Sequence, residues 1–530
     1  MVHRIPYRDT HRFADVVLDH LDDAPALREL RTFPPSWEGL DAAAKDRTFP
    51  PEHRATLVEA LRRQYGGWKL GEAVEANLAK LADPRSLTVT TGHQLVLFGG
   101  PLYVPFKLLN VVRLARDLEA RWDRPVVPVF WMASEDHDRP EIDHTWVNGK
   151  RITWPGATAG AVGKLRLDGI DPVLQELEAA LGPGSGPLVE RLKAHYAPGH
   201  DLARATRGLV HDLFGHLGIV VLDGDDPALK QLFAPVMENE LVNGVVKPAV
   251  DYADERLQQH YKVQAHARPI NLFHLRPGHR ARIERDGDLY RVLEGGPVFT
   301  LDELLQELRK RPEQFSPNVL MRPVYQETIL PNVAYVGGGG ELAYWLQLRW
   351  VFQALQVPMP VVLLRSSALL AGEKDLASLQ KLGLSVEDLF TDADALRTRV
   401  AKEGVDFSTS LADELARLDA LMQDLETRAA AVDPTLAASA RGHAARARKA
   451  VEGLQRKYER AARRKASERL ERLDRVLEHL FPGGGLQERK ENVLPWYLAE
   501  GDALWERLLE ALDPLNGHFT ILGADPAPAG

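Results

Sequence analysis

Alternating blocks of apolar and amphipathic sequence organise most of this chain. Between residues 86 and 122 a β-branched run, a glycine loop and a long amphipathic segment follow one another, which predicts a strand and then a helix. Val126 to Trp131 reads as a second strand buried on both faces. Residues 216–233 and 359–367 supply two more apolar strands. Four strands alternating with helices predict an open, mostly parallel sheet.

A different pattern interrupts this alternation between about 240 and 320. Asp286-Gly287 lies between two alternating runs, as in a β-hairpin with a type I′ turn. Thr300 and Glu303 have the spacing of a capping box that begins a helix. We therefore predict an insertion that carries a small antiparallel β element.

From about 405 to 481 the apolar positions follow a heptad pattern, typical of a coiled coil. Asp433 as N-cap and Pro434 at the first helical position divide this stretch into an antiparallel pair of helices. A helix from Pro434 to Phe481 would be about 70 Å long, more than the shorter helix covers. A second copy of the chain is the simplest partner for the remainder, which predicts a homodimer.

Together these patterns predict an α/β protein with a Rossmann-like, mostly parallel sheet, insertions and a long α-helical coiled-coil arm. The predicted parts are an N-terminal helical segment (1–85), the first part of the core (86–239), the insertion (240–320), the second part of the core (321–400), the arm (401–482) and a C-terminal helix and strand that return to the core (483–530).

Composition narrows the functional classes. The 530 residues are 45% hydrophobic and carry a formal charge of −9, which argues against a surface built throughout for nucleic acid. Residues 441–475 are locally basic; a solvated coiled-coil face is the favoured interpretation, and RNA or another polyanion is the alternative. No apolar run could span a bilayer and no secretory leader is recognisable, so we expect a cytoplasmic protein. The absence of cysteine excludes disulfides, thiolate ligands and a catalytic thiol.

Candidate chemistry lies where predicted strands end. After the first strand, His93 and Gln94 precede Gly99 and Gly100, and the loop leads into a helix whose N-terminus could bind an anion. A tight turn at Gly99-Gly100-Pro101 is the structural alternative, and the spacing matches neither a P-loop nor G-x-G-x-x-G.

The second strand ends in a cluster of acids and histidine, Glu135-Asp136-His137-Asp138, with His144 close behind. Such a cluster could hold an ammonium group, accept a proton or ligate a metal. A capping box of Asp138 with Glu141 is the structural alternative. We expect no tightly bound metal.

The third candidate region, residues 316–345, has four consecutive glycines, Gly337 to Gly340, before a helix that begins near Glu341. A helix N-terminus again suits an anion. Arg322 and, further on, Arg365 could bind a carboxylate or phosphate with two hydrogen bonds, although either could be structural.

Five segments of the chain resemble the bacillithiol biosynthesis cysteine-adding enzymes, a family of cysteine ligases. They are TGHQLVLFGGPLYVPFK (91–107), PVFWMASEDHD (128–138) with His144, VVLDGDDPALK (220–230), SPNVLMRPVYQETILPNVAYVGGGGELAYW (316–345) and LQERKENVLPWY (486–497). The resemblance implies a core similar to class I aminoacyl-tRNA synthetases and a coiled-coil arm used for dimerisation. It also implies the last step of bacillithiol synthesis, in which the carboxyl group of cysteine is joined to the amine of glucosaminyl-malate.

An amide bond of this kind needs an activated carboxylate, for which ATP with Mg is the usual co-substrate. On this hypothesis His93 and Gln94 line the activation site, while Asp136, His137 and Asp138 bind or deprotonate the amine. Arg322 or Arg365 would bind the malate carboxylates, and Arg489 and Asn492 would bind nucleotide. The further substrate-binding candidates are Gly99, Gly100, Tyr103, Lys107, Glu135, His144, Ser316, Asn318, Gly338, Gly339, Glu341, Tyr344 and Trp345.

Two alternatives remain open at this stage. A coiled-coil scaffold or RNA-binding protein would explain the basic arm but not the polar strand ends. A metal-dependent hydrolase would explain the acidic cluster at 135–138. Neither membrane nor nucleic acid is an expected partner of the ligase.

Overall fold

The computed structural model describes residues 2–156, 160–403, 410–465 and 467–523. At its centre is a parallel five-stranded sheet in the order β13-β12-β2-β3-β6. The strands are β2 (Leu87–His93), β3 (Val126–Met132), β6 (Val220–Asp223), β12 (Asn332–Gly337) and β13 (Val361–Leu364). The predicted α/β class and all four predicted strands are confirmed; β12, which the glycine run after it concealed, is the fifth.

The order of the strands decides where a ligand would bind. The chain builds β2, β3 and β6 outward in one direction, then returns to place β12 on the other side of β2. In open α/β sheets the crevice at such a reversal, beyond the carboxyl ends of the strands, is the usual ligand site.

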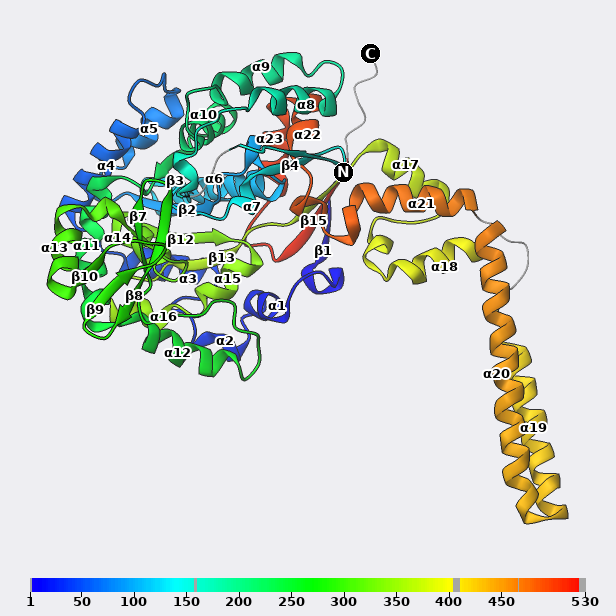
Figure 1. Cartoon of the computed structure of the whole chain (residues 1–530). Coiled ribbons are helices and arrows are strands. Elements are labelled where there is room, and N and C mark those ends of the chain that lie inside the picture. The colour runs from blue at the N-terminus through cyan, green and yellow to red at the C-terminus, as the bar shows by residue number, and fades with distance from the viewer. Residues whose placement is uncertain (1, 157–159, 404–409, 466, 524–530) are drawn as a thin grey trace.

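Helices surround this sheet (Figure 1). The long helix α6 (Tyr103–Trp122) packs against β2, β3 and β12, whereas α3 packs against β12 and β13. The remaining helices of the core are α1 (Asp15–Leu21), α2 (Pro25–Arg28), α3 (Trp37–Asp46), α4 (Pro51–Gln64), α5 (Glu72–Lys80), α7 (Arg139–Ile142), α8 (Asp171–Leu181), α9 (Gly186–His195), α10 (Leu202–Phe214), α11 (Pro227–Asn243), α12 (Val246–Leu257), α14 (Arg322–Ile329), α15 (Gly339–Trp345), α16 (Arg349–Ala354), α22 (Leu494–Glu500) and α23 (Ala503–Ala511).

The predicted insertion is an antiparallel sheet in the order β10-β9-β8-β7-β11. Asp286 pairs with Leu289, so the hairpin turn is centred on Gly287-Asp288, one residue later than predicted. The capping box of Thr300 and Glu303 is confirmed. The elements are β7 (Leu272–Arg276), β8 (His279–Asp286), β9 (Leu289–Val292), β10 (Val298–Thr300), β11 (Phe315–Pro317) and α13 (Leu301–Lys310).

Two smaller sheets complete the core. In one of them β15 (His518–Gly523) lies between β1 (Val2–Pro6), which is antiparallel to it, and β14 (Ala368–Ala371), which is parallel. The other is the hairpin of β4 (His144–Val147) and β5 (Lys150–Thr153).

The arm is the predicted helical hairpin (Figure 1). It consists of α19 (Ala412–Val432) and α20 (Pro434–Lys465), and Asp433 caps α20 by accepting a hydrogen bond from the backbone N–H of Thr435 at 2.7 Å. The single helix expected from 434 to 481 is wrong, because α20 ends at Lys465 and a differently directed helix, α21 (Ser467–Leu480), follows.

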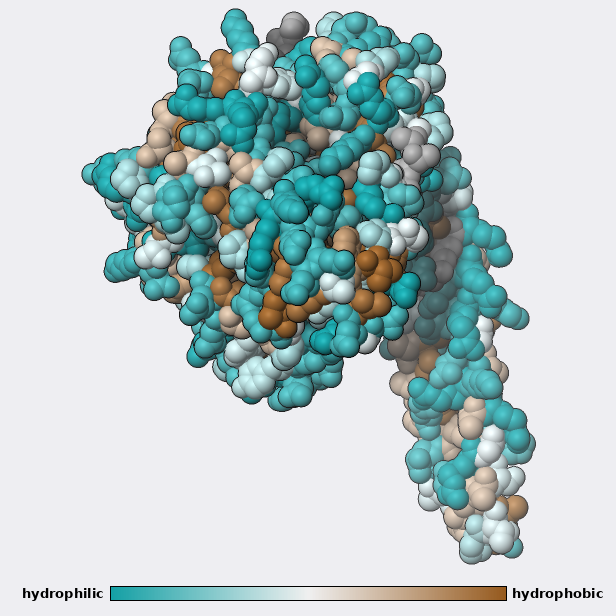
Figure 2. Space-filling model, turned by 60° about the vertical axis from the view of Figure 1, so that its left-hand side comes forward, coloured by the Kyte–Doolittle hydropathy of each residue, from teal (hydrophilic) through white to brown (hydrophobic). Residues whose placement is uncertain are grey.

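The helix that leads from the arm back to the core, α21, packs against other helices of the same chain. Helix α21 packs against α17 (Glu373–Leu382) and α18 (Ala393–Glu403), with Leu473, Val476 and Leu480 buried. Helix α20 also contacts α18, and beyond that contact the described parts of α19 and α20 pack mainly against each other. The surface of this hairpin is mostly hydrophilic with isolated apolar residues (Figure 2). Among the described residues no helix has both the length and the apolarity needed to cross a bilayer.

Candidate active site

A cavity of about 710 Å³ lies at the carboxyl ends of the central strands. Its floor comes from residues that follow β2, β3, β12 and β13, and β7, β8 and β11 of the insertion form the opposite wall. The cavity therefore lies at the reversal of strand order, where such a sheet leaves room for a ligand.

Most of the residues predicted from the sequence meet in this cavity, although they come from distant segments. Those that line it are His93, Gln94, Tyr103, Lys107, Glu135, Asp136, Asp138, Ser316, Asn318, Arg322, Gly338, Gly339, Glu341, Tyr344, Arg365 and Arg489. Those that do not are Gly99, Gly100, His137, His144, Trp345 and Asn492.

Gly99 and Gly100 form the tight turn that was the structural alternative. The N–H of Gly100 donates to the carbonyl of Leu97 at 3.0 Å, and its φ of 64° is in the left-handed region. A Cβ at this position would lie 2.2 Å from the side chain of Val96, so glycine is needed for the turn itself. The prediction that these amides face the ligand is not supported, because neither glycine lines the cavity and the N–H of Gly100 is used within the turn.

Three other candidates have structural partners outside the cavity. The ring of Trp345 is fully buried and stacks on Tyr335 with centroids 4.6 Å apart. Asn492 is buried and donates to the carbonyl of Phe98 at 3.1 Å, so it is unavailable for nucleotide. His144 lies in the β4 hairpin with Nδ1 3.0 Å from the carboxylate of Asp143.

His93 is at the bottom of the cavity and is fixed by both ring nitrogens. Nδ1 donates to the carbonyl of Gln94 at 2.9 Å, and Nε2 lies 3.0 Å from the hydroxyl of Tyr103. Burial, helped by the positive charge of Lys107, lowers the pKa of His93 to about 3. The ring is therefore neutral at physiological pH, so Nε2 accepts a hydrogen bond from Tyr103, and His93 has no free nitrogen to carry a proton.

Asp136 is the centre of an acidic wall at the end of β3. It accepts hydrogen bonds from Gln94, from Arg280 at 3.1 Å and from the backbone N–H of His137 at 2.8 Å. Burial opposes its ionisation, but hydrogen bonding from His137 and the charge of Arg280 outweigh this effect and hold the pKa of Asp136 well below its usual value. Asp136 is thus a fixed negative charge.

Arg280 also explains why His137 is beside the cavity rather than in it. Its Nη1 donates to Nδ1 of His137 at 2.8 Å, and the histidine ring packs on Phe273. The capping box of Asp138 with Glu141, the structural alternative for this cluster, does not form, because the side chain of Asp138 makes no capping hydrogen bond to helix α7 in the described structure.

Two buried lysine–carboxylate pairs support the walls. Lys230, fully buried, pairs with Glu135, and burial raises the pKa of that carboxyl. Lys107, also buried, pairs with Glu341 and donates to the carbonyl of Gly92 at 2.9 Å. The charge of Lys107 and the N–H of Gly338 overcome the burial of Glu341 and lower its pKa to about 2. Each pair is internally neutralised, so neither presents a free charge to a ligand.

The two candidate arginines differ in how many of their guanidinium N–H groups are already used by hydrogen bonds within the protein. Arg365 is buried, and its Nη2 donates to Glu488 at 2.7 Å, while Nη1 donates to the carbonyl of Ser366 at 3.1 Å. Arg365 is therefore a structural arginine. The guanidinium of Arg322 donates from Nη1 to Gln326 at 3.0 Å and lies close to the hydroxyl of Tyr344, while its buried Nη2 has no hydrogen-bond partner among the described residues.

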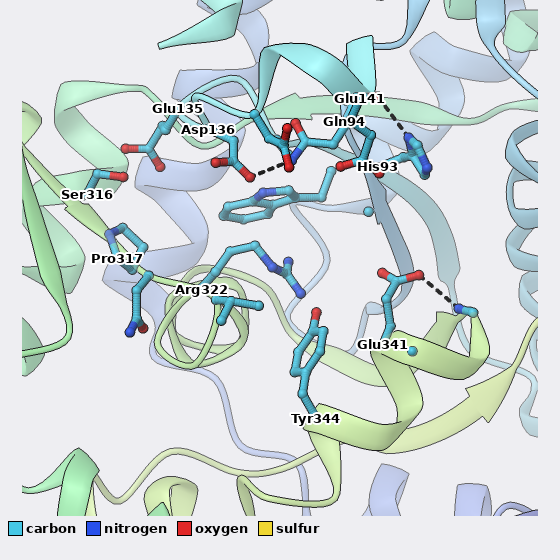
Figure 3. A pocket seen from close by; sticks show the side chains of 18 of the residues that line it. His93, Gln94, Glu135, Asp136, Glu141, Ser316, Pro317, Arg322, Glu341 and Tyr344 are labelled. Carbon is cyan, nitrogen blue, oxygen red and sulfur yellow. Dashed lines mark hydrogen bonds between the residues drawn. The ribbon is translucent and has the colours of Figure 1, made fainter. Parts of the chain in front are cut away.

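Figure 3 shows how these groups face each other. Gln94, Asp136 and Glu141 lie on one side, and Arg322 with the hydroxyl of Tyr344 lies on the other. Glu141 makes no side-chain hydrogen bond or ion pair in the described part of the chain, and burial next to Asp138 and Asp136 raises its pKa. The cavity thus has an acidic wall that includes the free carboxylate of Glu141, with Asp138 also lining it, and a basic wall that includes the guanidinium of Arg322. Arg268, Arg282 and Arg489 add positive charge to the lining.

Several lining residues were not predicted from the sequence. Arg280 lies in an alternating strand, where its position on the inward face of β8 was the only signal. Lys230 does not line the cavity but pairs with the lining residue Glu135, and it was not predicted either. It occupies a buried position of α11, within one of the segments that carry the resemblance. Further unpredicted lining residues include Trp131, Met132, Glu141, His266, Arg268, Asn271, Phe273, Arg282 and Tyr335.

A second cavity of about 650 Å³ adjoins the first and shares Gly339, Gly340, Arg365 and Arg489 with it. Arg12 and Lys262 add positive charge to its walls. No group of three or more His, Asp or Glu side chains is arranged to hold a metal ion within the described ranges.

Comparison with known proteins gives a consistent result. The family model described as "Bacillithiol biosynthesis BshC, N-terminal Rossmann-like domain" matches residues 1–366, and "Bacillithiol biosynthesis BshC, C-terminal coiled-coil domain" matches 368–524. The chain is 36% identical over 522 residues to a Cytophaga hutchinsonii protein named "Putative cysteine ligase BshC", covering 98% of both. Proteins of the same name from Flavobacterium johnsoniae and Koribacter versatilis are 36% and 32% identical, each covering 98% of this chain and 99% of the relative.

Proposed function

The chain belongs to the bacillithiol biosynthesis BshC family, and we propose that it forms an amide bond between the carboxyl group of cysteine and the amine of glucosaminyl-malate. The observation that carries this proposal is the cavity with a free carboxylate on one wall and a free guanidinium on the other. Both substrates carry an amine together with carboxylates, so a cavity of divided charge suits each of them.

The basic wall binds carboxylate in this proposal. Arg322, rather than Arg365, meets a carboxylate of the malyl group, because Arg365 already pairs with Glu488. Tyr344 points toward the same place and can donate its hydroxyl proton to the second oxygen (Figure 3).

In this proposal the acidic wall binds the substrate amine and removes a proton from it. Asp136 is a fixed charge that attracts an ammonium group, with Asp138 beside it at the mouth of the cavity. Attack requires the neutral amine, so a base must take one proton. Glu141 suits this role better than His93 or His137, because its carboxylate is free and its pKa is raised towards that of an amine. His93 instead orients Tyr103.

Activation of the cysteine carboxylate is assigned to ATP with Mg, since free carboxylates do not react with amines at a useful rate. The second cavity supports this assignment, because it is lined by cations and opens onto the first at Arg489. The residues there suit a polyanion, and Arg489 is the one predicted nucleotide residue that reaches it.

We also infer that the arm joins two copies of the chain. Leu421, Leu425 and Leu454 are 55%, 43% and 44% exposed on the hairpin of α19 and α20, and a second arm would cover them. This surface is the support for a homodimer.

Mass spectrometry tests the proposed activity. Purified protein is incubated with cysteine and glucosaminyl-malate, with and without ATP and magnesium, and a cysteinyl adduct of the sugar is expected only in the complete mixture. No adduct with any nucleotide would overturn the ligase, and an adduct without nucleotide would overturn ATP activation alone.

A further inference from the structure

A row of buried polar side chains runs from the cavity into the core beneath Arg322. Nη1 of Arg322 donates to Oε1 of Gln326 at 3.0 Å, and Nε2 of Gln326 donates to Oε1 of Glu327 at 2.8 Å. Gln326 is fully buried and Glu327 is 1% exposed. Polar groups at this depth are costly unless they are paired, so the arrangement needs an explanation beyond solubility.

The row continues to the central sheet. Nδ2 of Asn332, at the start of β12, donates to the same oxygen of Glu327 at 2.8 Å. The hydroxyls of Thr88 and Thr90 on β2 donate to Oδ1 of Asn332 at 3.2 and 2.9 Å. One end of the row is thus fixed to two strands, and the other end is Arg322 at the wall of the cavity.

The chemistry of the two ends sets the orientation of Gln326. Oε1 of Glu327 is an acceptor here, since it also accepts from Asn332, and a guanidinium only donates hydrogen bonds. The amide must therefore turn its NH₂ to Glu327 and its oxygen to Arg322. A reversed amide would place donor against donor at Arg322 and acceptor against acceptor at Glu327.

The same arrangement leaves the charge of Arg322 available. A carboxylate in direct contact would neutralise the guanidinium, as Glu488 does to Arg365 at 2.7 Å. The neutral amide of Gln326 holds the guanidinium of Arg322 in place without supplying a negative charge. Nη2 stays buried without a partner in the described structure, with the Trp131 and Tyr335 rings 5.9 and 5.4 Å from the guanidinium carbon.

We propose that Gln326 and Glu327 are positioning residues that hold Arg322 ready to bind a substrate carboxylate. The inference rests on the proposed function, because it takes Arg322 as the site of the malyl carboxylate. Gln326 acts only through Arg322 and does not touch substrate.

A double-mutant cycle tests this dependence. Gln326→Met keeps the volume of the side chain and removes both hydrogen bonds. We expect it to raise KM for glucosaminyl-malate about tenfold, the value of one lost hydrogen bond, with kcat and KM for cysteine little changed. In an Arg322→Met background the same change should have no further effect on KM. Equal effects in both backgrounds would show a merely structural role and overturn the inference.

Two further variants keep the test interpretable. Glu327→Gln preserves shape and should raise the same KM by a smaller factor. Thr328→Val is the matched control on α14, since its hydroxyl bonds only to the backbone of Val324 at 2.8 Å, and it should leave KM unchanged. Melting temperatures of all variants separate misfolding from loss of positioning.

Binding of L-malate to the same proteins, measured by isothermal titration calorimetry, separates the two proposals. A cycle in which Gln326→Met weakens malate only when Arg322 is present, in a protein that makes no product, supports positioning and overturns the ligase. If the protein forms product but the effects of the Gln326 and Arg322 substitutions on malate binding are additive, the ligase is supported and the positioning role of Gln326 is overturned. Malate that binds wild type and Arg322→Met equally overturns the inference.

Discussion

The core and the arm use charged residues in opposite ways. In the core, Lys107, Lys230 and Arg365 are buried and each pairs with a specific carboxylate. In the arm, α19 has no buried residue at all in the described structure, and its ion pairs are exposed. A pair in water contributes little and a broken pair in the interior costs much, so similar residues should respond very differently to mutation.

The largest difference is expected between two arginines. Arg365→Met leaves Glu488, which is fully buried, without its partner and should lower the free energy of unfolding by about 3–5 kcal/mol. Arg448→Met breaks a pair with Asp419 in which both side chains are about half exposed, so its effect on the free energy of unfolding should be much smaller. Urea unfolding followed by circular dichroism measures both, and equal losses would contradict the contrast.

A buried carboxylate without a full ion pair gives the next effect. Burial raises the pKa of Glu327 to about 7, so the folded protein retains a proton there that the unfolded chain loses near pH 4.5. This group therefore lowers stability as pH rises from about 4.5 to 7, by about 3 kcal/mol in all. The difference in unfolding free energy between wild type and Glu327→Gln should change by that amount across this window, and a constant difference would contradict the shift.

The free carboxylate of the cavity gives a catalytic effect of slightly smaller size. Glu141→Gln should lower kcat at least about 100-fold, a typical effect of losing a general base, and remove the acidic limb of the pH–rate profile. Glu75→Gln, an exposed carboxylate on α5, is the control and should have no effect. An unchanged acidic limb in the Glu141 variant would assign the base elsewhere.

The smallest effect on folding is expected in the arm. Leu421→Asp with Leu454→Asp should change the free energy of unfolding of the core by less than about 0.5 kcal/mol, because both side chains are exposed in the single chain. The same change should convert a dimer to a monomer in light scattering after size exclusion. Gln423→Asp on the same helix is the control, and a dimer that survives the double change would refute this interface.

The sequence predicted the elements whose pattern is local. The apolar strands and the heptad spacing of the arm each need only neighbouring residues, and both are confirmed. The different direction of α21 was not predicted, because it follows from the packing of α21 on α17 and α18, a tertiary contact that a continuous heptad pattern does not reveal. Strand β12 was not predicted, because its short apolar run passes directly into four glycines, a composition more typical of a loop.

The residues of the candidate site also divide into those that local sequence predicts and those that only the tertiary structure brings to the cavity. His93, Gln94 and Asp136 follow strands directly, so position in the sequence was enough to predict them. Arg280 reaches Asp136 from a separate sheet, a distance that no local pattern spans. Gly99 and Gly100 were misassigned because a turn and an anion-binding loop need the same residue, and only the direction of the amides separates the two.

The sheet that contains β1, β15 and β14 has a consequence for how the protein is made. Its middle strand, β15, is synthesised last, and Val2 pairs with Leu522 across nearly the whole described chain. At translation rates of about 5–20 residues per second, β1 remains without its neighbour for roughly 30 to 100 s. The parallel sheet can form on the ribosome during that time, but this small sheet can close only once β15 has been made and has left the ribosome. Its exposed edges during synthesis are a natural place for chaperone binding.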